Sequence, residues 1–298
     1  MTSAADQLWW PAPAKLNLML HITGRREDGY HQLETLFQLL DVGDELSFVV
    51  NDTGAINRLT DIAGVPAEQD LVVRAAHLLQ AHAGVSAGAE IDIRKRLPMG
   101  GGLGGGSSDA ATTLVALNAL WACGLPVDEL AMLGLQLGAD VPVFVKGESA
   151  FATGVGECLH PVSLPDCWYV VVTPNVHMST AAVFSDHALK RNCFPVDLNE
   201  LLEGFDLGAK KLAGINVCET IVVSQQKEVA NLLSAMAEFA PARMTGTGSS
   251  IFGRFSTEQE AQSCGKYFEG LNQQVFVARA VNRSPLLATL ENFRKTLS

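Results

Sequence analysis

The feature that most constrains the fold of this chain is a run of glycines at residues 100–106. Six of these seven residues are glycine, and Leu103 is the exception. Glycine gives up side-chain contacts and loses much backbone entropy on folding. Such a dense run of glycines therefore suits a backbone that must approach another group closely. Residues 89–97 alternate as a strand does, and an apolar helix is predicted from about Ser107. The segment therefore predicts a strand, a tight loop and a helix N-terminus in succession.

A loop of this kind is suited to binding phosphate. The first N–H groups of a helix lack partners within the helix, and the helix dipole attracts anions. Ser107 and Ser108 supply hydroxyls that could cap the helix or contact a phosphate or its metal ion. The alternative is a flexible linker, which does not explain why the run joins a strand to a strongly apolar helix.

Two common phosphate-loop motifs do not describe the run. A Walker A loop ends in Gly-Lys followed by Ser or Thr, whereas Gly106 directly precedes Ser107. The G-x-G-x-x-G spacing of the dinucleotide fingerprint is present, at Gly100, Gly102 and Gly105. That fingerprint also needs a strand ending in an acidic residue about 20 positions later. Asp128 has the spacing, but only residues 124–127 separate two predicted helices, so the sequence argues against an NAD-dependent oxidoreductase.

Composition excludes several other classes of protein. The 298 residues predict two domains or one large one, and the formal net charge of −11 opposes binding to nucleic acid or to anionic lipid. The six cysteines have no C-x-x-C spacing, and residues 1–10 have no basic and apolar segments of a signal peptide. We therefore expect a cytoplasmic protein with reduced cysteines. The longest uncharged stretches, 110–127 and 167–185, contain polar residues and predict buried core elements.

Hydrophobic periodicity predicts an α/β first part. Residues 14–22 alternate as a strand, with Lys15 and Asn17 on its mixed face. Residues 33–40 and 45–50 predict two further strands joined by a hairpin at 41–44. Helices are predicted from Asp70 to Gly84 and from about 128 to 137.

The second part has an α+β pattern, and the sequence pattern changes from the first type to this one near residues 155–165. Strands are predicted at 168–172, 251–255 and 275–281. One helix is predicted from Ser179 or Thr180 to Phe184, and two or three helices are predicted between residues 196 and 239. A further helix is predicted at 256–271, with a capping box formed by Ser256 and Gln259. The predicted boundary separates domain 1–158 from domain 159–298.

Five motifs carry a family resemblance. The loop from Pro98 to Ser108 resembles the phosphate loop of the GHMP kinases, which include galactokinase and the homoserine, mevalonate and phosphomevalonate kinases. Four further motifs resemble, in order, those of one branch, the 4-diphosphocytidyl-2-C-methyl-D-erythritol kinases. These are Pro13-Ala-Lys-Leu-Asn-Leu18, Gly29-Tyr-His31, Leu137-Gly-Ala-Asp-Val-Pro-Val-Phe144 and Thr245-Gly-Thr-Gly248. The resemblance spans most of residues 9–284, although 186–240 carries no matched motif.

The resemblance implies a fold and an activity. The fold would be the two-domain GHMP kinase fold, with a ribosomal-protein-S5-like N-terminal domain that binds ATP, a ferredoxin-like C-terminal domain that binds the acceptor, and an active site between them. The activity would be transfer of phosphate from ATP, with Mg²⁺, to an alcohol group: the 2-hydroxyl of 4-diphosphocytidyl-2-C-methyl-D-erythritol, in non-mevalonate isoprenoid synthesis. The implied partners are these small molecules, with no nucleic acid, no membrane and no resident metal.

Two residues are implied to be catalytic. Asp140 lies on a constrained turn before Val141-Pro142, and its carboxylate could accept the proton of the acceptor hydroxyl. On the sequence alone, a helix N-cap is an equal alternative, and the family match favours catalysis. Lys15 would hold the acceptor oxygen and Asp140 and stabilise developing charge. Without the matched motif, a lysine in a strand would be expected to be solvated.

The remaining candidate residues are implied to bind the two substrates. In the acceptor site, Tyr30 and Phe184 would stack on the cytosine and His31 would bond its edge, although a phenylalanine such as Phe184 is by default core. Asn17 and Thr180 would bind the erythritol or diphosphate part, and Gly246 and Gly248 would let a second turn approach it. The implied ATP-binding residues are Lys95, Leu97, Pro98, Met99, Gly100, Gly101, Gly102, Leu103, Gly104, Gly105, Gly106, Ser107 and Ser108.

Two departures from the family pattern and two rival functions remain. Asp70 and Asp109 stand where asparagine is expected, and the charge of Asp109 should weaken phosphate binding unless Mg²⁺ or the helix end offsets it. One rival is another small-molecule GHMP kinase of the homoserine or mevalonate type, against which the Gly29–His31 motif with Phe184 argues. The other is an ATP-binding regulatory protein without turnover, against which the presence of Lys15 and Asp140 argues.

Overall fold

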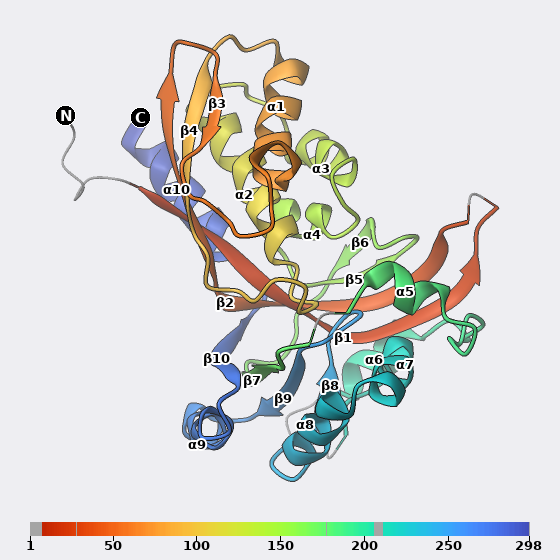
Figure 1. Cartoon of the computed structure of the whole chain (residues 1–298). Helices are drawn as coiled ribbons and strands as arrows, with labels where there is room; N and C mark the ends of the chain where they lie inside the picture. Colours follow the sequence, from red (N-terminus) through yellow and green to blue (C-terminus); the bar gives the residue numbers. More distant parts are fainter. Residues whose placement is uncertain (1–7, 28, 177, 206–210, 298) are drawn as a thin grey trace.

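The computed structural model describes residues 8–27, 29–176, 178–205 and 211–297. Within these residues, ten strands form one sheet whose main order is β3-β4-β2-β10-β7-β9-β8. Strands β1 and β5 also pair with β2, and β6 pairs with β5. Helices pack against this sheet in both halves of the chain (Figure 1). The fold is therefore an α/β first part joined to an α+β second part, as the sequence predicts.

Two long antiparallel strands run through the middle of the molecule (Figure 1). These are β1 (Trp9–Arg25) and β2 (His31–Asn51), which pair from Trp9 opposite Ser47 to Arg25 opposite His31. Irregularities in their register flank Lys15 and Asn17. The two strands reach both the first and the second hydrophobic core, so β1 contributes residues to each half of the molecule.

The predicted hairpin at residues 41–44 is wrong, because β2 continues through this segment without a turn. Its turn-like residues serve other contacts. A Cβ on Gly43 would lie 2.0 Å from the Ala12 carbonyl oxygen, so glycine is needed where β1 crosses closely. Asp44 accepts the backbone N–H groups of Arg96 and Leu97. Polar and glycine residues that are typical of a turn here contact β1 and the segment after β4 instead.

The first part places four helices against the sheet. Its further elements are β3 (Ile56–Arg58), a 3₁₀ turn (Ala67–Gln69), α1 (Leu71–Ala83), β4 (Gly88–Arg94), α2 (Gly105–Leu120), α3 (Val127–Leu135), α4 (Val141–Lys146), β5 (Ala150–Thr153) and β6 (Cys158–Pro161). The Asp70 side chain caps α1 by accepting the Val72 N–H, and Gly84 ends it with a left-handed φ of 65°. Both predicted ends of this helix are therefore confirmed.

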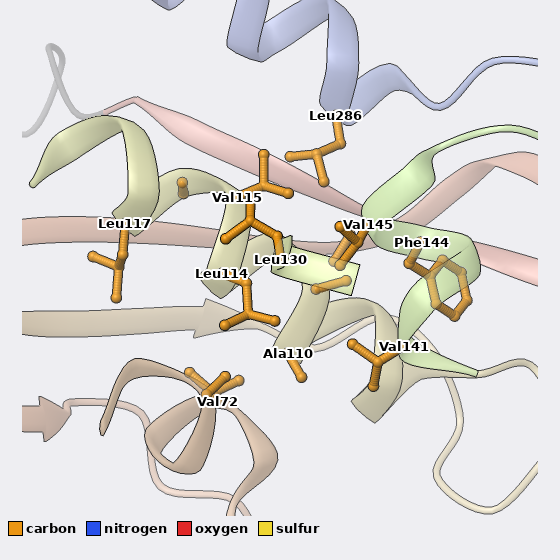
Figure 2. Close-up of a cluster of buried hydrophobic side chains, with 14 of the residues drawn as sticks. Val72, Ala110, Leu114, Val115, Leu117, Leu130, Val141, Phe144, Val145 and Leu286 are labelled. Atoms are coloured by element: carbon orange, nitrogen blue, oxygen red, sulfur yellow. The ribbon is translucent and has the colours of Figure 1, made fainter. Parts of the chain in front are cut away.

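Side chains from α1 to α4 form the first hydrophobic core. Figure 2 shows part of it, with Leu114 and Val115 of α2 between Val72 on one side and Leu286 on the other. Helix α2 runs through the middle of this core and is buried along most of its length. The glycine loop is therefore anchored by a helix that cannot shift without disturbing the core.

The second part contains an antiparallel sheet in the order β10-β7-β9-β8. Its elements are β7 (Trp168–Thr173), α5 (Thr180–Ser185), α6 (Leu198–Glu203), α7 (Val217–Gln225), α8 (Lys227–Ala237), β8 (Ala242–Met244), β9 (Ile251–Phe255), α9 (Glu258–Glu269), β10 (Gln274–Val281) and α10 (Pro285–Leu297). Strand β10 joins the two parts of the sheet by pairing with β2, Ala280 opposite Leu40.

The capping box predicted at Ser256 and Gln259 is wrong by one residue. Thr257 and Glu260 form it, and α9 begins at Glu258. Both pairs fit the same pattern of a hydroxyl followed three residues later by Glu or Gln. The carboxylate of Glu260 is the better partner because it also complements the positive end of the helix dipole.

Helix α10 returns to the first hydrophobic core. Leu286 is fully buried there, and Figure 2 shows it above Val115. The rings of Trp10 and Phe293 lie 5.4 Å apart between centroids. The domain division between residues 158 and 159 stays a prediction, and the contacts of α10 extend across it. Among the described residues, none of the helices has the length and apolar character needed to span a bilayer.

Candidate active site

A cleft of about 1050 Å³ lies between the two parts of the molecule. It is lined by the glycine loop and β1 on one side and by α5 and the 246–248 turn on the other. The cleft brings together the predicted catalytic and acceptor-binding residues, namely Lys15, Asn17, Tyr30, His31, Asp140, Thr180, Phe184, Gly246 and Gly248. Four predicted ATP-binding residues also line it: Gly100, Gly102, Gly104 and Ser107.

Lys15 is buried at the floor of this cleft, with a side chain that is 3% exposed. Its ammonium donates to the Asn17 Oδ1 at 2.5 Å and to the Gly102 carbonyl oxygen at 3.1 Å, and lies 3.1 Å from the Asp140 Oδ2. An ammonium has three donors, and these three oxygens match them. Lys15 is therefore held in one position. The alternative interpretation, a strand lysine exposed to solvent, does not agree with this arrangement.

Asp140 occupies the N-cap position of α4. In the described structure its side chain makes no hydrogen bond to the N-terminus of that helix, so the helix-cap alternative does not account for its orientation. The side chain is 34% exposed and faces Lys15. A carboxylate that is open to the cleft and fixed by an ammonium can accept a proton from a bound hydroxyl.

The glycine loop requires glycine at two positions for internal reasons. Gly102 and Gly104 have φ values of 77° and 74°. A Cβ on Gly102 would lie 2.4 Å from the Thr245 carbonyl oxygen, and one on Gly104 would lie 2.7 Å from the Phe144 ring. The close approach predicted from the glycines therefore includes other parts of this chain.

Helix α2 begins directly after this loop. Gly104 is its N-cap residue, and no side chain of the described structure caps it. The first N–H groups of the helix are therefore left for a ligand, as an anion site requires. Helix α2 begins two residues earlier than predicted, so Gly105 and Gly106 belong to its first turn.

A turn of the second part holds the glycine loop in place. The Thr245 hydroxyl donates to the Gly102 carbonyl oxygen at 3.3 Å and accepts the Asn17 N–H at 2.9 Å. The Ser250 N–H donates to the Gly101 carbonyl oxygen at 3.2 Å. The matched motif at 245–248 thus links the glycine loop to β1.

Nine predicted ATP-binding residues do not line the cleft, and ATP binding stays a prediction for all thirteen. They are Lys95, Leu97, Pro98, Met99, Gly101, Leu103, Gly105, Gly106 and Ser108. Three of them, Leu97, Leu103 and Ser108, have buried side chains, whereas Met99 is 60% exposed. Lys95 forms ion pairs with Asp44 and, at 2.8 Å, with Asp109.

Both departures from the family pattern have partners in the structure. Asp109 is buried, and burial raises its pKa to about 7 against the opposing effect of Lys95. Its extra charge is thus offset by Lys95, a partner that the sequence did not suggest. Asp70 caps α1 and forms an ion pair with Arg58 at 2.5 Å.

The aromatic wall of the cleft comes from both parts of the molecule. The His31 and Phe184 rings are stacked, with centroids 5.4 Å apart and planes at 22°. Phe184 also packs against the second hydrophobic core, so its two alternative roles are compatible. Tyr30 is 66% exposed beside the cleft. The Thr180 and Thr247 hydroxyl oxygens lie 3.0 Å apart.

Sequence reasoning missed Thr247, which lines the cleft, and Arg191, which contacts His31 of its aromatic wall. Thr247 lies inside the matched Thr-Gly-Thr-Gly motif, so the motif itself was a signal for it. Arg191 donates from Nε to the Nε2 of His31 at 3.1 Å. It lies in the region without a matched motif, 160 residues from its partner, and no local pattern indicates such a contact.

Comparison with known proteins places the chain in a family. Models of the GHMP kinases N terminal domain and the GHMP kinases C terminal match residues 70–148 and 198–269. A 4-diphosphocytidyl-2-C-methyl-D-erythritol kinase of Burkholderia mallei is 52% identical over 280 residues, covering 93% of this chain and 95% of the relative. The corresponding kinase of Shewanella piezotolerans is 51% identical over 290 residues, covering 97% and 99%.

Solved structures agree with this placement. A crystal structure of 4-(cytidine 5'-diphospho)-2C-methyl-D-erythritol kinase has a TM-score of 0.80 and 34% identity, and the match covers 92% of this chain and 99% of that one. A homoserine kinase from Cytophaga hutchinsonii has a TM-score of 0.70 but 18% identity, with 95% and 97% covered, so it supports the fold alone. The predicted two-domain GHMP kinase fold is thus confirmed. The chain belongs to the GHMP kinases, in the branch of the 4-diphosphocytidyl-2-C-methyl-D-erythritol kinases.

Proposed function

We propose that this protein transfers the γ-phosphoryl group of ATP to the 2-hydroxyl of 4-diphosphocytidyl-2-C-methyl-D-erythritol, a step of non-mevalonate isoprenoid precursor synthesis. The observation that carries the proposal is the Lys15–Asp140 pair, which lies between a glycine loop and an aromatic wall in one cleft. The names of the relatives that match nearly the whole chain support the same substrate. We place the reaction in the cytoplasm, with small molecules as partners.

The chemistry assigns one role to each residue of the pair. Asp140 accepts the proton of the acceptor hydroxyl as its oxygen forms a bond to the γ-phosphorus. The bond from that phosphorus to the bridging oxygen breaks, and ADP leaves. The Lys15 ammonium lies 3.1 Å from the same carboxylate and offsets negative charge that develops near the acceptor oxygen.

ATP would lie with its phosphates at the N-terminus of α2, and Mg²⁺ would enter with them. Mg²⁺ usually binds to the nucleotide's phosphates, to one or two protein oxygens and to water. The Ser107 hydroxyl lines the cleft beside the glycine loop and suits this ion. When bound, Mg²⁺ would neutralise charge on the phosphates. We assign residues 1–158 to ATP binding and 159–298 to acceptor binding.

An assay of ADP release tests the proposed reaction. The purified protein is offered ATP with 4-diphosphocytidyl-2-C-methyl-D-erythritol, with homoserine or with mevalonate. We expect acceptor-dependent ADP release with the cytidyl compound alone. Turnover of homoserine or mevalonate without turnover of the cytidyl compound would favour the rival kinases instead.

The phosphate site predicts a specific effect of charge at Gly106. This exposed residue lies in the first turn of α2, and a Cβ there meets only ordinary contact, with Leu71 at 3.7 Å. Gly106→Glu should preserve or raise the thermal midpoint of unfolding, because an acid suits a helix N-terminus. It should also weaken ATP binding by about tenfold or more through repulsion of the phosphates. Calorimetric titration of ATP measures the loss.

The neutral variant Gly106→Gln is the matched control for this charge. It has nearly the same side-chain size, so it should retain most of the ATP affinity. Equal losses in both variants would show steric blockage rather than phosphate at this helix end. Unchanged affinity in Gly106→Glu would move the phosphates elsewhere.

The aromatic wall predicts where substrate affinity is lost. Tyr30→Ala and Phe184→Ala should each remove stacking worth about 1–3 kcal/mol, which corresponds to roughly a five- to hundredfold higher KM for the cytidyl substrate. ATP affinity should not change, and the two losses should be less than additive because a base held on one side is already loose. Steady-state kinetics of the two single variants and the double variant test this.

Tyr267→Ala provides the matched control, since this half-exposed tyrosine lies on α9, outside the cleft. Circular dichroism must show that Phe184→Ala is folded, because Phe184 also contacts the second core. A wild-type KM in folded Tyr30→Ala and Phe184→Ala would mean that the cytosine binds elsewhere.

A further inference from the structure

Arg191 connects the two walls of the cleft through a single guanidinium group. Its Nη2 donates to the carbonyl oxygens of Phe184, at 2.8 Å, and Asp186, at 2.7 Å, at the end of α5. Its Nη1 donates to the Leu189 carbonyl oxygen at 3.2 Å. Its Nε donates across to the Nε2 of His31 at 3.1 Å, at the start of β2. The same side chain thus binds the His31 ring and the backbone of Phe184, the two residues whose rings are stacked.

The contact with His31 determines where the imidazole carries its proton. A guanidinium has only donors and remains protonated in proteins. The Nε2 of His31 must therefore present its lone pair to Arg191, and a neutral imidazole must then carry its hydrogen on Nδ1. Protonation of Nε2 would set two N–H groups against each other, so the contact also favours neutral His31.

The charges around His31 act in the same direction. Burial lowers the pKa of His31, and the positive charges of Arg191 and Arg25 lower it further. Tyr30 precedes it in the chain, and the Lys15–Asp140 pair lines the same cleft. The side-chain carboxylate of Asp186 instead accepts a bond from Gln225 at 2.9 Å.

We propose that Arg191 is a positioning residue that fixes His31 as a neutral Nδ1–H donor toward the nucleobase of the acceptor. A base is then recognised through an acceptor atom, such as the N3 or O2 of cytosine, and an edge that offers only donors is rejected. This inference rests on the proposed function for the identity of the base. The tautomer itself does not depend on that function.

The tautomer can be measured in the unmodified protein. With ¹⁵N-labelled histidine, long-range ¹H–¹⁵N correlations distinguish a protonated ring nitrogen from one with a free lone pair. His31→Asn identifies the His31 signals among those of the seven histidines. We expect protonated Nδ1 and unprotonated Nε2 in His31 between about pH 7 and 8. Protonated Nε2 in this range overturns the proposal, whatever the enzyme phosphorylates.

Kinetics of Arg191→Met then test the consequence for the substrate. The variant frees His31 to carry its proton on either nitrogen, so the KM for the cytidyl substrate should rise about three- to tenfold at pH 8, as loss of one hydrogen bond gives. At lower pH, His31 of the variant becomes an imidazolium with N–H on both nitrogens. The Nδ1–H donor toward the base is then restored. The ratio of variant to wild-type KM should therefore fall toward one as the pH is lowered to about 6.

This pH dependence separates positioning from a purely structural role. If Arg191 only fastened the end of α5, the KM ratio would be the same at every pH, and that result contradicts the proposal. Lys190→Met is the matched control, because the neighbouring Lys190 is exposed and removal of its charge should leave the ratio near one. If wild-type protein does not turn over the cytidyl compound, the proposed function fails, while the tautomer measurement still decides the role of Arg191.

Discussion

Replacing Asp140 by asparagine should lower kcat about a hundredfold or more, as loss of a general base does. Asparagine keeps the size of the side chain and can still accept a hydrogen bond from Lys15, 3.1 Å away, so the fold and the cleft should persist. The amide cannot take up the proton of the acceptor hydroxyl. The KM for the cytidyl substrate and the affinity for ATP should change little, because the loss arises in the transition state.

A second carboxylate on the same part of the molecule gives the control for this experiment. Asp128 pairs with Lys146, is 77% exposed and lies outside the cleft. Asp128→Asn should retain wild-type kcat. Near-normal turnover by folded Asp140→Asn would leave the carboxylate with a structural role only. Single-turnover measurements of phosphoryl transfer show directly whether the chemical step is slowed.

Lys15→Met should lower kcat by about 10²- to 10³-fold, the range for loss of one preorganised electrostatic donor. Methionine is of similar length, but it removes the ammonium donor from the Asn17 Oδ1 and one of two donors from the Gly102 carbonyl oxygen, which keeps the Thr245 hydroxyl. We expect a stability loss of about 1–3 kcal/mol from these buried groups. Because the Gly102 carbonyl belongs to the glycine loop, the KM for ATP should also rise, which Asp140→Asn should not cause.

The two catalytic variants should not be additive. Lys15 and Asp140 act on the same oxygen, so the double variant should lose little more than the worse single variant. Lys146→Met is the control, since it removes an ammonium from the exposed pair with Asp128. Independent, multiplying losses in the double variant would contradict the proposal that the pair works as a unit.

Structural features that depend only on residues close together in the chain were predictable from the sequence. The cap at Asp70 and the stop at Gly84 follow from residue types at the helix ends, and both were confirmed. Alternation over residues 14–22 correctly predicted a strand. The motifs also named the catalytic and acceptor-binding residues that the cleft brings together, although their roles stay predictions.

Features that depend on distant partners were not predictable in this way. Asp41 and Asp44 have the residue types of a turn, yet Asp41 accepts the Arg279 N–H and Asp44 accepts those of Arg96 and Leu97. Nothing near these residues distinguishes a turn from a strand edge that binds another segment. The neutralisation of Asp109 by Lys95 is of the same kind, because it needs the relative position of β4 and α2.

The return of α10 to the first core affects the order in which the protein can fold during synthesis. A domain that leaves the ribosome first often folds before the rest has been made. Here Leu286 and Phe293 complete the core around Trp10 and α2, and β10 must also pair with β2. The first part of the molecule therefore remains unfinished until these late residues emerge. During most of translation the nascent chain exposes an apolar surface to chaperones, and premature termination leaves a fragment without a closed core.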